Sequence, residues 1–363
     1  MNEPGLDGSF WPSERQKLLL RTAFAGGEAS AEAWRTLRPR LDLDRLELGS
    51  FPVLPLVHRQ LAALGIEDPY MARLAGIRRR TWAMNRLGLD ALAPTLRALE
   101  DAGAEPVVVG GWELPVHYYG GDFGLRPVEG LEVLVRPGFA LPGRDGTCTV
   151  HERFAREFSA PGRELEDLWE KTFEISVGET RARALGASDE LVRLCLTGAR
   201  ATLPPGILWA ADSLAVLASG AAIDWERVVR HALRLRAMLR LRDALVYLRR
   251  ELGAPVPEAA FRELEATPPR RRERLAHRTA GRSRRLLGPW PRTAALKAKS
   301  ASLTRAGSHS PDRPSTAETT VPGCASASAR CRSRPASPHR ARSTSPAASK
   351  ARAAASRSPT FSR

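Results

Sequence analysis

The stretch at residues 106–137, PVVVGGWELPVHYYGGDFGLRPVEGLEVLVRP, decides how this chain folds. It opens with the β-branched run 107–109 and turns on Gly110 and Gly111. It closes with 131–135, an apolar run interrupted only by Glu132. Two short apolar runs joined by a glycine turn and a short helical segment predict a strand–turn–helix–strand unit. Because both runs are nearly all apolar, we expect strands that are covered on both faces.

Helical patterns flank this unit on both sides. Residues 14–64 carry several short helical patterns, and Asp68 followed by Pro69 marks the start of a long helix that runs to about residue 102. Beyond the unit, the longest amphipathic pattern covers 224–252. The sequence therefore predicts an α/β (α+β) protein, in which N- and C-terminal helical regions flank a small mixed β-sheet core.

We expect four segments along the chain. They are an N-terminal helical region at 1–105, the core at 106–186, a C-terminal helical region at 187–290 and a tail at 291–363. The tail holds 15 serines and few large apolar residues. It cannot bury enough apolar surface to offset the entropy lost on ordering, so we predict that it is disordered.

The net charge of +16 belongs mainly to the end of the chain. Residues 292–363 hold 14 Lys and Arg against 2 acidic residues, and 268–288 hold 8 Arg against 1 Glu, which leaves a net charge of −3 elsewhere. Three interpretations of the basic tail stay open. It is an arm that binds nucleic acid, a solvated tail without a partner, or the product of translation in a shifted reading frame.

Composition argues against several classes of protein. The four cysteines lack the C-x-x-C spacing of a zinc site, and no apolar run reaches the roughly 18 residues needed to cross a bilayer. The first residues show no basic region followed by an apolar core, so we expect no signal peptide. We therefore expect a cytoplasmic protein without a membrane partner.

Glu132 is the first candidate for a functional residue. An unpaired carboxylate within an apolar strand is costly, which favours a functional role over a structural one. Its structural alternative is a salt bridge, with Arg126 as partner, and Arg126 is equally a candidate to contact a triphosphate. The run Arg78–Arg79–Arg80 on the long helix is a second candidate for phosphate contact, although a solvated helix face is the favoured interpretation.

Several further stretches carry a resemblance. They are AWRTL, GSFPVLPLVHRQLAALG, GIRRRTWAMNR, the glycine turn with HYYG, GLRPVEGLEVLVRP, DELVRLCLTGAR and LWAADSLAVL, in that order. Together they resemble the uncharacterised nucleotidyltransferase family of the DNA polymerase β-like superfamily, over roughly residues 14–290.

The resemblance implies a metal-dependent transferase. A glycine turn after the first strand contacts a nucleoside triphosphate, and an Asp-x-Asp pair on the second strand binds Mg²⁺ with a third carboxylate from a later strand. The reaction is transfer of a nucleoside monophosphate to an acceptor hydroxyl. An acid-x-acid pair suits this task because residues i and i+2 of a strand point to one face, and magnesium prefers carboxylate oxygens.

This chain departs from the family pattern at each of these points. The turn is Gly-Gly where the family has Lys-Gly. The acidic pair is replaced by Glu129–Gly130–Leu131–Glu132, so only the second carboxylate is kept in kind, and Glu129 needs a bulge or loop at Gly130 to reach the same face. The third acid is missing from the matching stretch at 149–152.

Two functions follow as alternatives. The chain is a nucleotidyltransferase with impaired chemistry, or an inactive relative that serves as a binding or scaffold module. On residues alone we favour impairment, because losing an acid from a two-metal site raises the barrier. The candidate catalytic residues and metal ligands are Glu132 and Glu129, with Asp122 or Asp145 as further ligands; those for the triphosphate are Gly110, Gly111 and Arg126.

Overall fold

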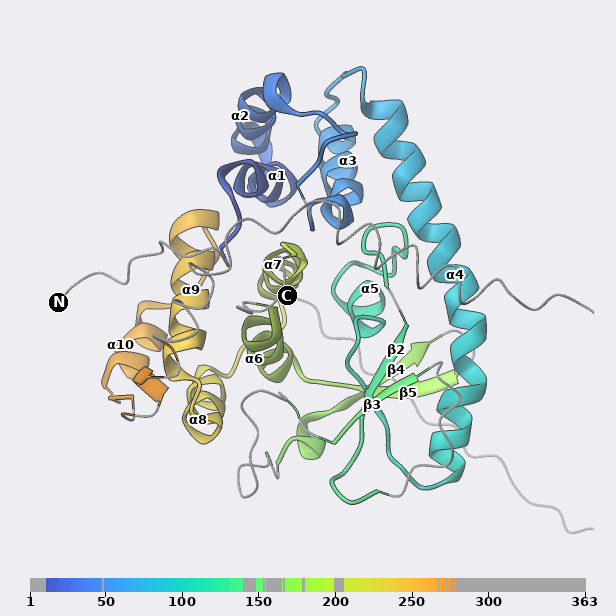
Figure 1. Cartoon of the computed structure of the whole chain (residues 1–363), viewed down its shortest axis with the longest axis vertical. Helices are drawn as coiled ribbons and strands as arrows, with labels where there is room; N and C mark the ends of the chain where they lie inside the picture. The colour runs from blue at the N-terminus through green and yellow to red at the C-terminus, as the bar shows by residue number, and fades with distance from the viewer. Residues whose placement is uncertain are drawn as a thin grey trace, which may run out of the picture. The chain divides into compact units, whose positions relative to one another are not determined.

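Three short helices, two 3₁₀ turns and one long helix build the N-terminal part of the computed structural model (Figure 1). The structure describes residues 11–277 apart from 48, 129, 140–147, 153, 155–164, 166, 178–179, 199–205, 267, 270, 272 and 276. Glu129, Asp145 and the tail predicted at 291–363 lie outside these residues. The described residues belong to one compact unit, and the segment boundaries expected at 105 and 186 stay predictions.

The N-terminal helices pack on one another around apolar side chains. The first begins at a capping box, in which the hydroxyl of Ser13 accepts from the backbone of Gln16 while the Gln16 side chain accepts from the backbone of Ser13. The elements are α1 (Glu14–Phe24), α2 (Gly27–Leu37), the 3₁₀ turns η1 (Arg38–Arg40) and η2 (Phe51–Val53), and α3 (Leu54–Ala63).

Helix α4 (Met71–Asp101) connects these helices to the sheet. Its N-terminal half packs on α3 and its C-terminal half runs along the sheet (Figure 1). The helix begins at Met71 with Tyr70 as its N-cap, two residues later than the start predicted at Asp68 and Pro69, and Asp68 accepts a hydrogen bond from the backbone of Tyr70 in the turn before it. Pro94 lies within the helix without ending it, because packing on both sides holds the helix together.

A five-stranded mixed sheet forms the core, as expected. The strand order is β3-β2-β1-β5-β4; β1/β5 and β2/β3 are parallel, and β1/β2 and β4/β5 are antiparallel. The strands are β1 (Val107–Val108), β2 (Leu131–Leu134), β3 (Cys148–His151), β4 (Phe173–Val177) and β5 (Thr180–Ala184).

Alternation along β1 and β2 covers both faces of these strands. Val108 and Val133 point to the cluster formed with Leu96 of α4, whereas Val107 and Leu134 join the larger core on the other face. The expectation of doubly covered strands is therefore confirmed.

Of the C-terminal helices, α6 and α7 lie nearest the second face of the sheet, and α8 and α9 pack on the far side of α6 (Figure 1). The single helix predicted at 224–252 is wrong, because the structure divides it at Arg236, whose φ of +54° ends α8 in the left-handed conformation. No glycine or proline marks this break in the sequence. The elements are α5 (Glu113–His117), η3 (Trp169–Lys171), α6 (Ala187–Gly198), α7 (Leu208–Ala218), α8 (Trp225–Leu235), α9 (Met238–Leu252) and α10 (Glu258–Ala266).

The length and hydropathy of each helix show whether it could span a membrane. Among the described residues, no helix combines the length and apolar character required to cross a bilayer.

Two glycines of α4 give a matched test of the contact between this helix and the glycine turn. A Cβ at Gly88 would lie 2.9 Å from the buried ring of Trp112, whereas one at Gly76 meets nothing within 4 Å. We expect Gly88→Ala to lower the free energy of unfolding by about 1–3 kcal/mol through overpacking. Gly76→Ala should raise it by up to about 1 kcal/mol through helix propensity. Urea denaturation measures both, and a gain in stability for Gly88→Ala contradicts the contact.

Candidate functional site

The glycine turn packs directly against the acid-bearing strand. A Cβ at Gly110 would lie 2.6 Å from Cβ of Glu132, and the backbone N–H of Val109 donates to the carbonyl of Glu132 at 3.0 Å. Gly111 has a φ of +107°, and a Cβ there would lie 2.0 Å from Nη1 of Arg126. Four of the predicted site residues, Gly110, Gly111, Arg126 and Glu132, therefore meet at one place.

Gly130 shapes the entry to β2. Its φ of +79° belongs to the left-handed region, which glycine adopts without the strain of a side chain. Its carbonyl accepts a hydrogen bond from Nε1 of Trp112 at 2.8 Å, which ties the start of β2 to the glycine turn. Glu129, the preceding residue, lies outside the described part of the chain.

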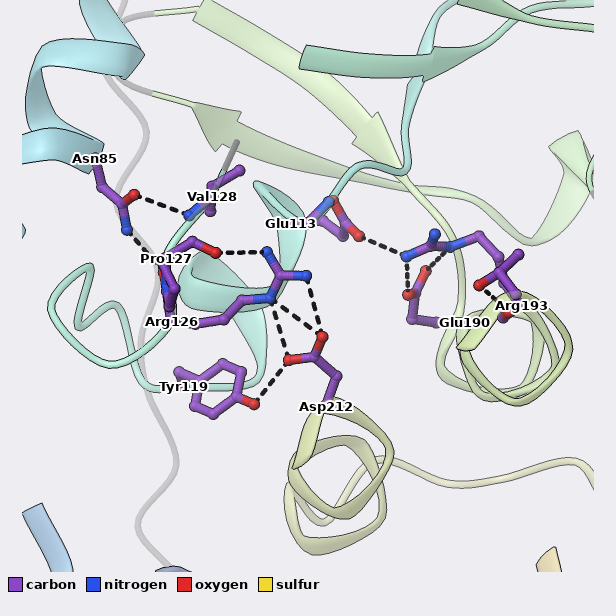
Figure 2. Close-up of polar contacts among 11 residues, drawn as sticks. Asn85, Glu113, Tyr119, Arg126, Pro127, Val128, Glu190, Arg193 and Asp212 are labelled. Carbon is purple, nitrogen blue, oxygen red and sulfur yellow. Dashed lines mark hydrogen bonds and ion pairs between the residues drawn. The ribbon is translucent and has the colours of Figure 1, made fainter. Parts of the chain in front are cut away.

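Arg126 forms a buried ion pair with Asp212 of α7. Nε lies 3.1 and 3.2 Å from the two carboxylate oxygens of Asp212, and Nη2 lies 3.0 Å from Oδ2 (Figure 2). The Tyr119 hydroxyl donates to Oδ1 at 2.8 Å. Burial acts to lower the pKa of Arg126, but Asp212 outweighs it and raises the pKa. The guanidinium is therefore held charged, with its head on Gly111.

Asn85 of α4 fixes the loop that carries Arg126. Its amide nitrogen donates to the carbonyls of Phe123 and Arg126 at 2.7 and 2.8 Å, and its amide oxygen accepts from the backbone of Val128 at 3.0 Å (Figure 2). Asn85, which makes all three hydrogen bonds, is only 1% exposed. The loop therefore cannot move without leaving buried polar groups unpaired.

A second buried charge cluster lies behind the turn. Arg193 of α6 contacts the carboxylates of Glu190 and Glu113, and Glu113 also accepts from the backbone N–H of Gly111 at 3.0 Å (Figure 2). Burial, followed by the charge of Glu190, raises the pKa of Glu113 from 4.5 to about 8. Near neutral pH, Glu113 is therefore protonated.

The carboxylate of Glu132 lies beside an imidazole of the next strand. Nε2 of His151 lies 3.0 Å from Oε2 of Glu132, and both side chains are partly exposed. In the parallel pairing of β2 and β3, Thr149 is the register partner of Glu132, so the two side chains share a face of the sheet. A threonine therefore stands beside the one carboxylate of this strand.

These groups line a pocket of about 400 Å³ between the sheet and the C-terminal helices. Apolar side chains also line it, among them Phe154 and Trp209. The sheet wall contributes Gly110, Glu132, Thr149 and His151, and the helix wall contributes Arg193 and Asp212.

The donors do not fit a two-magnesium site. Within the described ranges no group of three or more His, Cys, Asp or Glu side chains is arranged to hold a metal ion. Glu132 and His151 supply one carboxylate oxygen and one nitrogen, whereas magnesium prefers oxygen ligands and a two-metal site needs several carboxylates. Asp122 is engaged elsewhere, in an ion pair with Arg78.

The sequence analysis missed four residues of the site. Asp212, Glu113, Glu190 and Arg193 lie within apolar helical stretches, and each ends up nearly buried. A signal was present, because a charged residue inside an apolar helix requires a buried partner. The identity of that partner is a long-range property, since Arg126 and Asp212 are 86 positions apart.

Comparisons with known proteins give no further identification. No family model matches the chain, and no match is found among curated proteins or solved structures.

The raised pKa of Glu113 predicts a pH-dependent stability. The folded chain holds the proton up to about pH 8, whereas the unfolded chain releases it near pH 4.5. The free energy of unfolding should therefore fall as pH rises between these values, by at most about 1.4 kcal/mol per pH unit. Glu113→Gln should remove this slope and Glu100→Gln, at an exposed position of α4, should keep it. Equal slopes in both variants contradict the assignment.

Proposed function

We propose that this chain is a nucleotidyltransferase-like protein that binds a nucleoside triphosphate in the pocket beside the glycine turn and whose transfer chemistry is impaired. The observation that carries the proposal is the contact of Gly110 with Glu132 at the pocket wall. It brings a glycine turn and an acid-bearing strand together, which is the arrangement expected from the resemblance in the sequence.

The chemistry of the pocket suits a nucleotide. A volume of about 400 Å³ lies in the range of small-molecule sites. His151 on the sheet wall supplies a donor for phosphate oxygens, and Arg193 on the helix wall, which is paired with Glu113 and Glu190, adds a positive charge. Phe154 and Trp209 supply apolar surface against which a base can pack.

The proposed impairment follows from the missing carboxylates. In nucleotidyl transfer, an acceptor hydroxyl oxygen attacks the α-phosphorus, the bond to the bridging oxygen breaks, pyrophosphate leaves and the hydroxyl proton passes to a base. Metal ions stabilise the charge that develops on these oxygens. Gly130 and Thr149 occupy two of the acid positions, and Glu132 is the remaining carboxylate in the described part of β2 and β3. We therefore propose that the chain still binds the triphosphate but has lost most of its ability to transfer the nucleotide.

An inactive binding module is the second candidate. It is favoured by the short distance between Glu132 and His151, because a carboxylate that is held by an imidazole is less available to a metal ion. The two candidates share the nucleotide pocket and differ in whether any transfer remains.

Calorimetric titration with each of the four nucleoside triphosphates, with and without Mg²⁺, tests the proposal. We expect at least one triphosphate to bind in both conditions. Glu132→Gln should reduce the increase in affinity that Mg²⁺ gives at least ~10-fold, because changes to residues that only support a metal ligand already weaken metal affinity by that factor. Glu100→Gln is the matched control. Absence of heat for all four triphosphates, alongside a folded circular dichroism spectrum, overturns the proposal.

A gain-of-function variant separates the two candidates. The double variant Gly130→Asp/Thr149→Asp places acids on either side of Glu132, at the cost of about 1–2 kcal/mol of backbone strain at position 130. For the impaired enzyme we expect Mg²⁺-dependent release of pyrophosphate to rise above the low wild-type level. A wild-type level of zero that the double variant leaves unchanged favours the inactive module.

A further inference from the structure

Four basic side chains come from the two helices α3 and α4, which pack on each other. His58 and Arg59 belong to α3, and Arg78 and Arg79 belong to α4; we call them the α3–α4 basic cluster. In addition to burial, the charges of Arg78 and Arg79 lower the pKa of His58, and the charge of Arg78 lowers the pKa of Arg59. The sequence analysis favoured a solvated helix face for part of this cluster.

Arg59 is half-buried, and within the described ranges it has no hydrogen-bond or ion-pair partner. Burial, and then the charge of Arg78, lower its pKa against the opposing effect of Tyr119 and Asp122. A partly desolvated cation without a paired anion costs free energy, which is why buried charges are normally paired. The folded chain therefore holds a cation that an added anion would stabilise.

The nearby acid does not meet this demand. Asp122 is the ion-pair partner of Arg78, and its other oxygen accepts from the backbone of Gly124 at 2.8 Å. His58 is a second polar group without a partner, because its Nδ1 is buried and makes no hydrogen bond. Burial lowers the pKa of His58, with further contributions from Arg78 and Arg79.

We propose that the α3–α4 basic cluster is a binding site for a phosphate group, supplied either by the backbone of a single-stranded nucleic acid or by a free phosphate compound. The planar guanidinium fork of Arg59 matches phosphate oxygens in two parallel hydrogen bonds. Arg79 is exposed at the same place and supplies a further positive charge.

The position of the cluster relates it to the buried network of the pocket. Tyr119 is among the groups that raise the pKa of Arg59, and the Tyr119 hydroxyl donates to Asp212, the partner of Arg126. This site is separate from the proposed triphosphate pocket, whose lining does not include Arg59.

Thermal unfolding of the full chain in inorganic phosphate and in chloride of equal ionic strength tests the site. In chloride, Arg59→Met should be as stable as wild type or more stable, since it removes an unpaired half-buried charge. In phosphate, wild type should gain melting temperature and Arg59→Met should lose most of that gain. Arg80→Met, at an exposed position of the same arginine run, should keep it.

Binding of a fluorescent short single-stranded RNA distinguishes the two sources of phosphate. RNA binding that weakens at least ~10-fold in Arg59→Met, as expected for loss of a charged hydrogen bond, identifies a nucleic-acid backbone. Stabilisation by inorganic phosphate without Arg59-dependent RNA binding identifies a free phosphate compound. The proposal is overturned if neither probe acts on wild type, or if Arg59→Met and Arg80→Met respond alike to both.

Discussion

The buried pair between Arg126 and Asp212 is the contact on which the pocket depends. Arg126 comes from the loop before β2 and Asp212 from α7, so the pair joins the sheet wall to the helix wall. Its position requires Gly111, because any side chain there would occupy the space of the guanidinium. Removing two charges from water is costly, and the fork geometry with the added bond from Tyr119 offsets that cost. The glycine turn thus makes room for the guanidinium of Arg126.

This arrangement alters the role expected of the glycine turn, which was contact with a triphosphate. The N–H of Gly111 donates to Glu113, and the neighbouring guanidinium is already paired, so part of the expected phosphate cradle is occupied by the protein's own charges. Apart from the Arg126–Asp212 pair, the charged and imidazole groups that line the pocket are Glu132, His151 and Arg193, of which Arg193 is itself paired with Glu113 and Glu190. Such a set of groups favours binding an anion over assembling metal ions for transfer. The proposed loss of chemistry and retention of binding have this common origin.

Local features of the fold could be predicted from the sequence, and long-range ones could not. The strand runs on either side of the glycine turn rest on short-range patterns, and the structure confirms them. The long helix α4 was also predicted, but it begins at Met71, two residues after the start expected at Asp68 and Pro69. The break at Arg236 was missed because a non-glycine residue takes a left-handed conformation there. The partner of Arg126 was missed because nothing local links it to Asp212. Periodicity shows which residues are buried, but it does not show which buried charges meet.

A double-mutant cycle on Arg126 and Asp212 tests this account most directly. Urea unfolding of Arg126→Met, Asp212→Leu and the double variant gives the coupling energy of the pair. We predict that each single change lowers the free energy of unfolding by about 3–5 kcal/mol, since it strands one buried charge. The double variant should lose less than the sum of the two, by at least ~1 kcal/mol. Additive losses would contradict the claim that this pair holds the two walls of the pocket together.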